Sequence, residues 1–344
     1  MQSISLGRVS QACQLAHALE ASGASPERLL RQLNLPCWHH CDPDGLLPSH
    51  QLYRIAARFS KVSGIPAFGV RAMELTPISE MSGLGAAIAA EATLFRALHA
   101  AIELIPRYGT SKRWWLTEAG DDVWMLRGAG VRFDEGENIM VQHNLAGLVQ
   151  IVRIAAGPDW RPPRVRVQAP GTASLDTTEM FSRSRILPDP TWSGIAVPKA
   201  LLPLPTATSA RVVRQRCHRW LPKPPEPGDF AGSVRAVITT LLGEGYPEIE
   251  TTAEILGLRV RTLQRHLAVR GVMYRGLVDQ ARFEAARNLL GRSEASITEI
   301  GYDLGYQDAA HFTRAFKRWA GVSPSVFRRT AAVPTSANGA RSDV

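Results

Sequence analysis

Several features that would assign this chain of 344 residues to other protein classes are missing. No apolar run approaches the roughly 18 residues that a membrane-spanning helix needs. The opening residues, MQSISLGRVSQ, lack the basic region and apolar block of a secretory signal. Four cysteines are too few for a disulfide framework. We therefore expect a cytoplasmic protein that has no membrane contact.

Sequence signatures of common enzyme and metal sites are also missing. The chain has no glycine-rich phosphate loop and no nucleophile elbow, so we predict that it is not an enzyme and needs no cofactor. The segment Cys37-Trp-His-His-Cys41 offers zinc-ligand side chains at Cys37, His39, His40 and Cys41. Structural zinc sites generally draw two ligand pairs from separate segments, which this spacing does not provide. We interpret the segment as a loop between helices, and metal binding there stays open.

The charge is positive but spread along the chain. The formal net charge is +9. Residues 231–330 contain 14 Lys and Arg against 10 Asp and Glu, a net charge of +4, which leaves +5 elsewhere. A positive total favours an anionic partner without locating its site.

One structural pattern occurs twice near the C-terminal end. The first copy is TTAEILGLRVRTLQRHLAVRG, residues Thr251–Gly271, and the second is SITEIGYDLGYQDAAHFTRAFKRWAG, residues Ser296–Gly321. Each copy predicts a short amphipathic helix, a turn at Gly257 or Gly305, and a second amphipathic helix. Two helices joined by a tight turn that contains glycine are typical of a helix-turn-helix.

The second helix of each copy has a predicted buried stripe and a polar outer face. The motif Leu-x-Arg-x-Leu/Phe places Arg265 and Arg314 at equivalent positions, 49 residues apart. Arg and Lys can bond phosphates or purine edges, and Gln264 can read adenine through its amide. Ser296 or Thr298 and then Asp308 are placed to cap the helices of the second copy.

A single long helix is predicted between the copies, from Tyr274 to Leu290. At 1.5 Å per residue it spans roughly 25 Å. One turn of B-DNA is about 34 Å, so both recognition helices could enter successive major grooves from one face.

These segments resemble the DNA-binding domain of AraC/XylS-type transcription regulators. The resemblance covers residues 230–330 and depends on AEILGLRVRTLQRHL, on RFEAARNLL and on ITEIGYDLGYQDAAHFTRAFKRWAGVSPSVFRR. The first recognition helix ends one residue earlier than in many relatives. The resemblance implies binding to double-stranded promoter DNA, a homodimer, and contact with RNA polymerase, more often for activation than for repression. The DNA-binding residues expected from the motif and the helix faces are Arg261, Thr262, Gln264, Arg265, Asp308, Ala309, Ala310, His311, Thr313, Arg314 and Lys317.

The rest of the chain predicts a small mixed α/β domain in a mainly α protein. Helices are expected over 8–21, from Pro26, from Ser49, from Pro66, after Thr93 and over 134–156, with a hairpin around AGDD and strands at 164–168 and 194–197. We expect an effector-binding and dimerisation domain at 1–218, with a last helix over 208–220, and a proline-rich linker at 219–229. An all-α domain of two helix-turn-helix units joined by a long helix follows at 230–330, and the tail at 331–344 is expected to be disordered.

The front part resembles the effector domain of a branch that includes ornithine-utilisation-type regulators. The matching segments are PISEMSGLGAAIAAEATLFRALHAAIELIPRYG and FSRSRILPDPTWSGIAVPKALLPLP. The resemblance implies a small-molecule effector, either amino-acid-derived or fatty-acid-like. Candidate effector-binding residues are Trp114, Trp115, Trp124 and His143, although aromatic residues on a hairpin more often pack a core. A buried arginine such as Arg107 or Arg113 would suit a carboxylate ligand.

Three functions fit these sequence features. The first is a ligand-responsive, sequence-specific transcription regulator. The second is an Ada-like DNA-repair alkyl-transfer enzyme that carries the same DNA-binding domain. None of the four cysteines of this chain lies in the Pro-Cys-His-Arg pattern that such enzymes use, which argues against this function. The third is a DNA binder without sequence preference. Effector identity, operator sequence and the sign of regulation stay open at this point.

Overall fold

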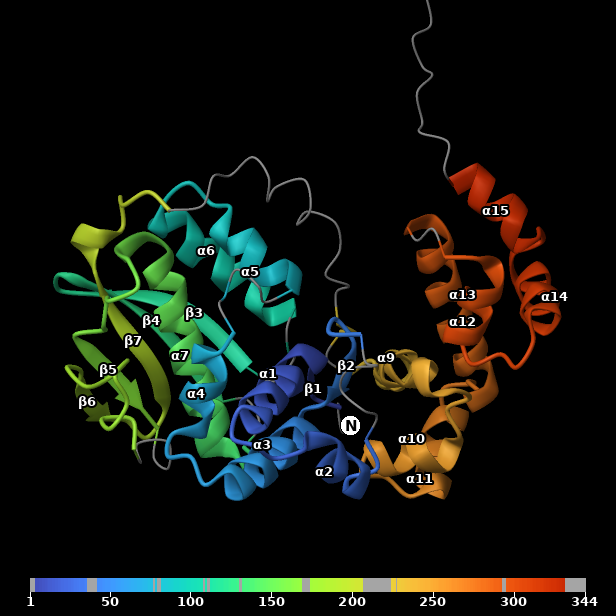
Figure 1. Ribbon diagram of the computed structural model, residues 1–344, viewed down its shortest axis with the longest axis horizontal. Helices are drawn as coiled ribbons and strands as arrows, with labels where there is room; N and C mark the ends of the chain where they lie inside the picture. The colour runs from blue at the N-terminus through green and yellow to red at the C-terminus, as the bar shows by residue number, and fades with distance from the viewer. Residues whose placement is uncertain are drawn as a thin grey trace, which may run out of the picture.

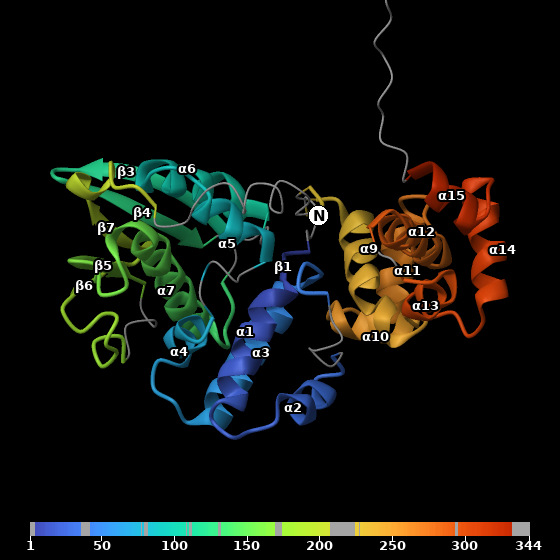
Figure 2. The same cartoon turned by 45° about the horizontal axis from the view of Figure 1, so that its top comes forward.

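A computed structural model shows two lobes joined by a central group of helices (Figures 1 and 2). It describes residues 4–35, 42–76, 78, 82–107, 109, 112–129, 132–168, 174–206, 224–226, 228–292 and 295–331. The lobe with the sheet and the lobe of α9–α15 lie at opposite ends of the view, and α1–α3 lie between them. The predicted fold class is confirmed: the protein is mainly α, and the sheets among the described residues are small and lie in the N-terminal region.

The central group is built from two short strands and four helices. Strand β1 (Leu6–Arg8) pairs antiparallel with β2 (Leu46–Pro48), and both strands are buried. The four helices are α1 (Val9–Glu20), α2 (Pro26–Gln32), α3 (Ser49–Ser63) and α4 (Phe68–Glu74). The predicted helix starts at Pro26 and Ser49 are confirmed. The two strands were not predicted, because three-residue strands carry no readable alternation.

The N-terminal lobe is a five-stranded sheet packed against helices. The strand order is β3-β4-β7-β5-β6, with β5 and β6 parallel and the other pairs antiparallel. The strands are β3 (Lys112–Ala119), β4 (Asp122–Ala129), β5 (Arg164–Val167), β6 (Arg185–Pro188) and β7 (Trp192–Pro198). The hairpin and the strands at β5 and β7 were predicted, whereas no strand was predicted at β6.

Helices α5 (Ser82–Ala89), α6 (Leu94–Leu104) and α7 (Glu137–Ala156) complete this lobe, with short 3-10 turns η3 (Ile105–Arg107) and η4 (Lys199–Leu201). Thr93 caps α6 as predicted, since its hydroxyl accepts from the amide of Arg96. Helix α7 begins three residues later than expected, because Gly136 before it takes a φ of +73°. By length and composition α7 could cross a membrane, yet much of it is buried in the protein as a core helix.

The C-terminal lobe is all α. Its helices are α9 (Phe230–Leu241), η5 (Leu242–Glu244), α10 (Ile249–Ile255), α11 (Val260–Ala268), α12 (Tyr274–Arg292), α13 (Ile297–Asp303), α14 (Ala309–Ala320) and α15 (Pro324–Ala331). The pair α10–α11 and the group α13–α15 lie towards opposite ends of α12 (Figure 1). The helix predicted over 208–220, the Cys37–Cys41 segment and most of the tail fall outside the described residues.

A continuous hydrophobic core joins the central helices to the first half of the C-terminal lobe. It includes Leu46 and Leu47 of β2 together with Val237, Ile238 and Leu241 of α9. The hydroxyl of Thr240 accepts from the amide of Leu46 at 2.8 Å and donates to the carbonyl of the same residue at 2.9 Å. The helix-turn-helix lobe is therefore docked on the N-terminal part by buried contacts, in addition to the chain connection between them.

Candidate nucleic-acid interface and effector cavity

The first helix-turn-helix consists of α10 and α11. Gly257 lies at the turn with a φ of +68°, a conformation that favours glycine because a Cβ would clash with the backbone. Leu263 and Leu267 of α11 are fully buried, at 0% and 1% exposure. Four residues apart on a helix, they fix one face of α11 against the core and turn the other face outward.

The second helix-turn-helix consists of α13 and α14. Ser296 and Glu299 form a capping box at the start of α13, and Gly305 takes a φ of +74° at the turn. The carboxylate of Asp308 accepts from the amides of Ala310 and His311 and so caps α14. Phe312 and Phe316 are fully buried. Both predicted turns and the predicted Asp308 cap are confirmed, and the buried stripes are confirmed at Leu263, Leu267, Phe312 and Phe316.

The predicted DNA-binding residues lie on the outer faces of α11 and α14. Eight of the eleven are exposed: Arg261, Gln264, Arg265, Asp308, Ala310, His311, Arg314 and Lys317. The other three, Thr262, Ala309 and Thr313, are half-buried, and the Thr313 hydroxyl already donates to the Ala309 carbonyl at 2.8 Å. Their placement suits contact with a duplex, and the contact itself stays a prediction.

Electrostatics differ between the two units. Residues 259–275 contain five arginines and no Asp or Glu. Residues 302–318 contain three basic side chains and two acidic ones, Asp303 and Asp308. The hydrogen bonds from backbone N–H groups hold the pKa of the Asp308 carboxyl below its usual value, and the bond from the amide of His311 has the largest effect. Asp308 therefore stays charged near neutral pH, so the first unit has the more favourable surface for phosphate.

Arg282 of α12 is a structural residue of the second unit that pattern reasoning missed. Its side chain is buried and its Nη2 donates to the Gly305 carbonyl at 3.1 Å. Its guanidinium lies over the rings of Tyr306 and Tyr246, at 4.4 and 5.0 Å from their centroids. The contacts tie the glycine turn to the long helix. An arginine among apolar positions of an expected helix was the signal available in the sequence.

The predicted effector residues fall on two faces of the sheet. Trp114 and His143 line one cavity. Trp115 and Trp124 belong to a separate apolar cluster, where Trp115 packs edge-on against Trp192 and Trp124 lies under Arg166. Successive side chains of a strand point to opposite faces, so Trp114 and Trp115 cannot share a pocket. The structure thus corrects the grouping of the four residues.

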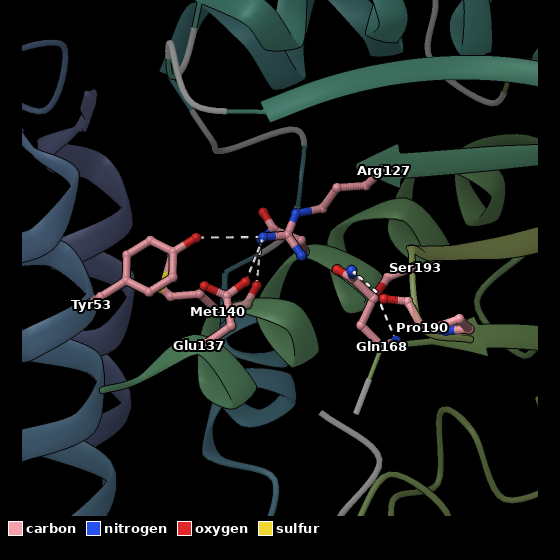
Figure 3. A network of polar contacts seen from close by, with 8 residues as sticks. Tyr53, Arg127, Glu137, Met140, Gln168, Pro190 and Ser193 are labelled. Atoms are coloured by element: carbon pink, nitrogen blue, oxygen red, sulfur yellow. Dashed lines mark hydrogen bonds and ion pairs between the residues drawn. The ribbon is translucent and has the colours of Figure 1, made fainter. Parts of the chain in front are cut away.

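Neither arginine named as suitable for a carboxylate ligand is buried. Arg107 and Arg113 are exposed, whereas Arg8 and Arg127 are buried, at 0% and 2% exposure. Arg127 extends from β4 towards α3 and α7, where its Nη2 donates to Glu137 at 3.2 Å and to the Tyr53 hydroxyl at 3.4 Å (Figure 3). Burial raises the pKa of Tyr53 well above its usual value, so the phenol stays protonated.

The paired helix-turn-helix units with exposed basic faces define a class of DNA-binding proteins. Comparison with known proteins identifies the family. Residues 252–330 match a helix-turn-helix domain family. Residues 23–206 match the family described as the N-terminal arabinose-binding domain of AraC transcription regulator. The chain belongs to the AraC family and is a ligand-responsive transcription regulator.

The relatives that align with most of this chain have lower sequence identity to it than a relative that aligns with a quarter of it. The chain is 23% identical to the ornithine utilization regulator of Pseudomonas aeruginosa over 83% of this chain and 85% of the relative. It is 24% identical to the regulator VirS of Mycobacterium tuberculosis over 89% and 91%. Identity with the regulator VqsM of Pseudomonas aeruginosa is 44%, over 25% of this chain and 26% of that relative. The crystal structure of CdpR from Pseudomonas aeruginosa is similar over 88% of this chain and 96% of that one, with a TM-score of 0.39 and 21% identity.

Proposed function

We propose that the protein reads specific promoter sequences as a homodimer and activates transcription through contact with RNA polymerase, in the cytoplasm, where promoter DNA is found. The observation that supports sequence-specific reading best is the equivalent placement of Arg265 and Arg314. Both side chains are exposed, and each is on the second helix of its unit. The residues two positions before and after each arginine are buried, namely Leu263 and Leu267 in the first unit and Phe312 and Phe316 in the second. Arginine recognises guanine and phosphate through paired N–H groups.

The first unit is proposed to supply most of the base discrimination. Arg261, Gln264 and Arg265 are exposed together on α11 and all have hydrogen-bonding groups. At the start of α14 the corresponding surface is formed by Ala309 and Ala310, which can contribute only van der Waals contact, for example with a thymine methyl group. Base changes facing the first unit should therefore cost more affinity than base changes facing the second.

The alternative of an alkyl-transfer enzyme requires a reactive cysteine. Cys13 is half-buried, and burial raises the pKa of its thiol to about 11. A thiol with a raised pKa has little thiolate at neutral pH and is a poor nucleophile. A methyl-transfer assay on alkylated DNA separates the two functions, since the regulator is expected to transfer nothing.

The test begins with genome-wide mapping of bound promoters, followed by gel-shift titration on a mapped site. Arg265→Ala should weaken operator binding by about 1–3 kcal/mol. Arg183→Ala, an exposed arginine in the N-terminal lobe, is the matched control and should leave affinity unchanged. Equal affinity of the wild type for mapped and scrambled duplexes at the same salt concentration would favour the binder without sequence preference.

Dimerisation and activation need separate measurements. Sedimentation equilibrium should give twice the chain mass, and transcription from a mapped promoter with purified RNA polymerase should rise when the protein is added. A monomer, or a fall in transcript, would contradict the corresponding part of the proposal.

A further inference from the structure

Two adjoining cavities lie inside the N-terminal part, between α1, α3, α5, α7 and β3. The space open to a water-sized molecule is about 40 Å³ in one and about 70 Å³ in the other. Four residues, Gln11, Ile105, Trp114 and Asn144, line both cavities. The shared lining makes the two cavities parts of one hollow, which is partly open to solvent.

The larger cavity has mostly apolar walls. Its aliphatic lining comes from helices and turns that are far apart in the sequence, and consists of Met73, Ile78, Leu84, Ile88, Leu148 and Ile151. Ile88 and Ile151 are almost fully buried, at 0% and 2% exposure. An aliphatic or alicyclic group placed here would gain roughly 25 cal/mol for each Å² of apolar surface removed from water.

The polar groups that line the cavities are side-chain amides, hydroxyls and one imidazole. The amide nitrogen of Asn144 donates to the Met140 carbonyl, which leaves its side-chain oxygen to accept from a ligand. Gln11 brings a second amide to the same junction, and His143 is already hydrogen-bonded to Gln14 at 2.7 Å. None of the described residues that line the two cavities is Asp, Glu, Lys or Arg.

The two buried arginines nearby lie outside this lining and have protein partners. Arg8 donates from Nε and Nη2 to the Arg107 carbonyl at 3.1 and 2.9 Å. Arg127 is paired with Glu137 behind Tyr53 through its Nη2, whereas its Nε and Nη1 are buried and have no hydrogen-bond partner among the described residues. A charged ligand without an opposite charge beside it would be costly to bury, because its hydration is lost without compensation.

We propose that these joined cavities form the effector site and that the effector is an uncharged molecule with an aliphatic or alicyclic body and one hydroxyl, carbonyl or amide group. The proposal rests on the proposed function, since it assumes that the regulator responds to a small molecule held in this lobe. The body of the ligand lies among Ile88, Ile151 and Trp114. Its polar group lies at the junction, against Gln11 and Asn144. Free amino acids, which have two charges, and ionised fatty acids are poor ligands for this site.

Helix α3 links the site to the DNA-binding lobe. Leu52 and Tyr53 line the smaller cavity. Gln51, the preceding residue, donates from Nε2 to the carbonyl of Ile255 at 2.9 Å, at the end of α10. A ligand that shifts the first turns of α3 therefore acts directly on the first helix-turn-helix unit.

A matched series of probes tests the chemical class. Octanamide, octanoate and octylamine have the same chain with a neutral, a negative and a positive end. Each is titrated into the full-length protein at pH 7 by calorimetry, with the shift in melting temperature as a second readout. Octanamide is expected to bind, with octanoate and octylamine at least about tenfold weaker. Binding of either charged probe as tightly as octanamide would overturn the proposed class.

Variants test the site. Asn144→Leu should weaken octanamide binding about fivefold to tenfold through the lost hydrogen bond. The control Asn288→Leu, at an exposed position of α12, should not change it. Gln11→Met gives a second measurement should Asn144→Leu fail to fold. Octanamide affinity that is unchanged in the folded cavity variants would refute the site.

The gel-shift titration on the same preparation separates this inference from the proposed function. Intact operator binding with no binding of any probe would reject only the effector site. Failure to distinguish a mapped promoter from scrambled DNA would reject the proposed function, whatever the probes do.

Discussion

Gln51 of α3 and Ile255 of α10, 204 residues apart in the sequence, are joined by a buried hydrogen bond of 2.9 Å from the glutamine amide to the isoleucine carbonyl. This bond and the Thr240–Leu46 pair lie on the same docked surface. Together they fix the first helix-turn-helix unit on the lobe that contains the cavity.

Thr240→Val should destabilise the docked arrangement. The substitution keeps the shape of the side chain and removes the hydroxyl that accepts from the Leu46 amide, so a buried N–H loses its partner. The expected cost is about 1–3 kcal/mol in the free energy of unfolding. Urea denaturation measures it. Thr239→Val is the matched control, because Thr239 is exposed and its hydroxyl bonds only within α9. An equal loss of unfolding free energy in both variants would show that the bonds between Thr240 and Leu46 add nothing specific to stability.

Arg282→Ala should destabilise the second helix-turn-helix unit. The variant loses the hydrogen bond to Gly305 and the contact with the ring of Tyr306. We expect a loss of about 1–3 kcal/mol in the free energy of unfolding, measured by denaturation. Arg287→Ala, at an exposed position one and a half turns further along α12, should change stability little. A stable Arg282→Ala variant would mean that the turn is held by its own packing.

The cap at Asp308 predicts an acid-dependent loss of stability. Its pKa is lowered in the folded state from a usual value of 3.8. The stabilisation is therefore complete above pH 3.8 and is lost as the pH falls through the lower folded-state pKa. Urea midpoints at pH 6 and pH 3 measure the change. Asp308→Asn keeps a cap without a titrating group, so its loss between the two pH values should be smaller than in the wild type. An equal loss would contradict the role given to Asp308.

Lys317→Ala should reduce the salt dependence of operator binding. Lys317 is exposed near the end of α14 and is proposed to contact phosphate. Removal of one phosphate contact lowers the slope of log affinity against log salt by about 0.9. Gel shifts at several salt concentrations give the slope, and Lys61→Ala on α3 is the control with the same charge change. A slope that stays at the wild-type value would remove Lys317 from the interface.

The cavity was only partly visible in the sequence. Trp114 and His143 were candidates, and both line the larger cavity. Their neighbours Trp115 and Trp124 were grouped with them because the hairpin register, which decides the face of each side chain, was not known. Nothing in the sequence indicated Gln11 on α1 or Asn144 on α7, since these residues line one cavity only because two helices distant in the sequence lie around it.

By itself the sequence determined the two helix-turn-helix units, their glycine turns at Gly257 and Gly305, and the family. Those features depend on contacts within a few residues along the chain, such as a cap three residues from its amide or a buried stripe at helical spacing. Only the tertiary structure decided that α3 joins the cavity to α10 and that the described lining residues include no Asp, Glu, Lys or Arg. It also decided that Arg8 and Arg127 are buried whereas Arg107 and Arg113 are exposed. These results depend on side chains brought together from distant segments, and no local periodicity encodes which of them meet.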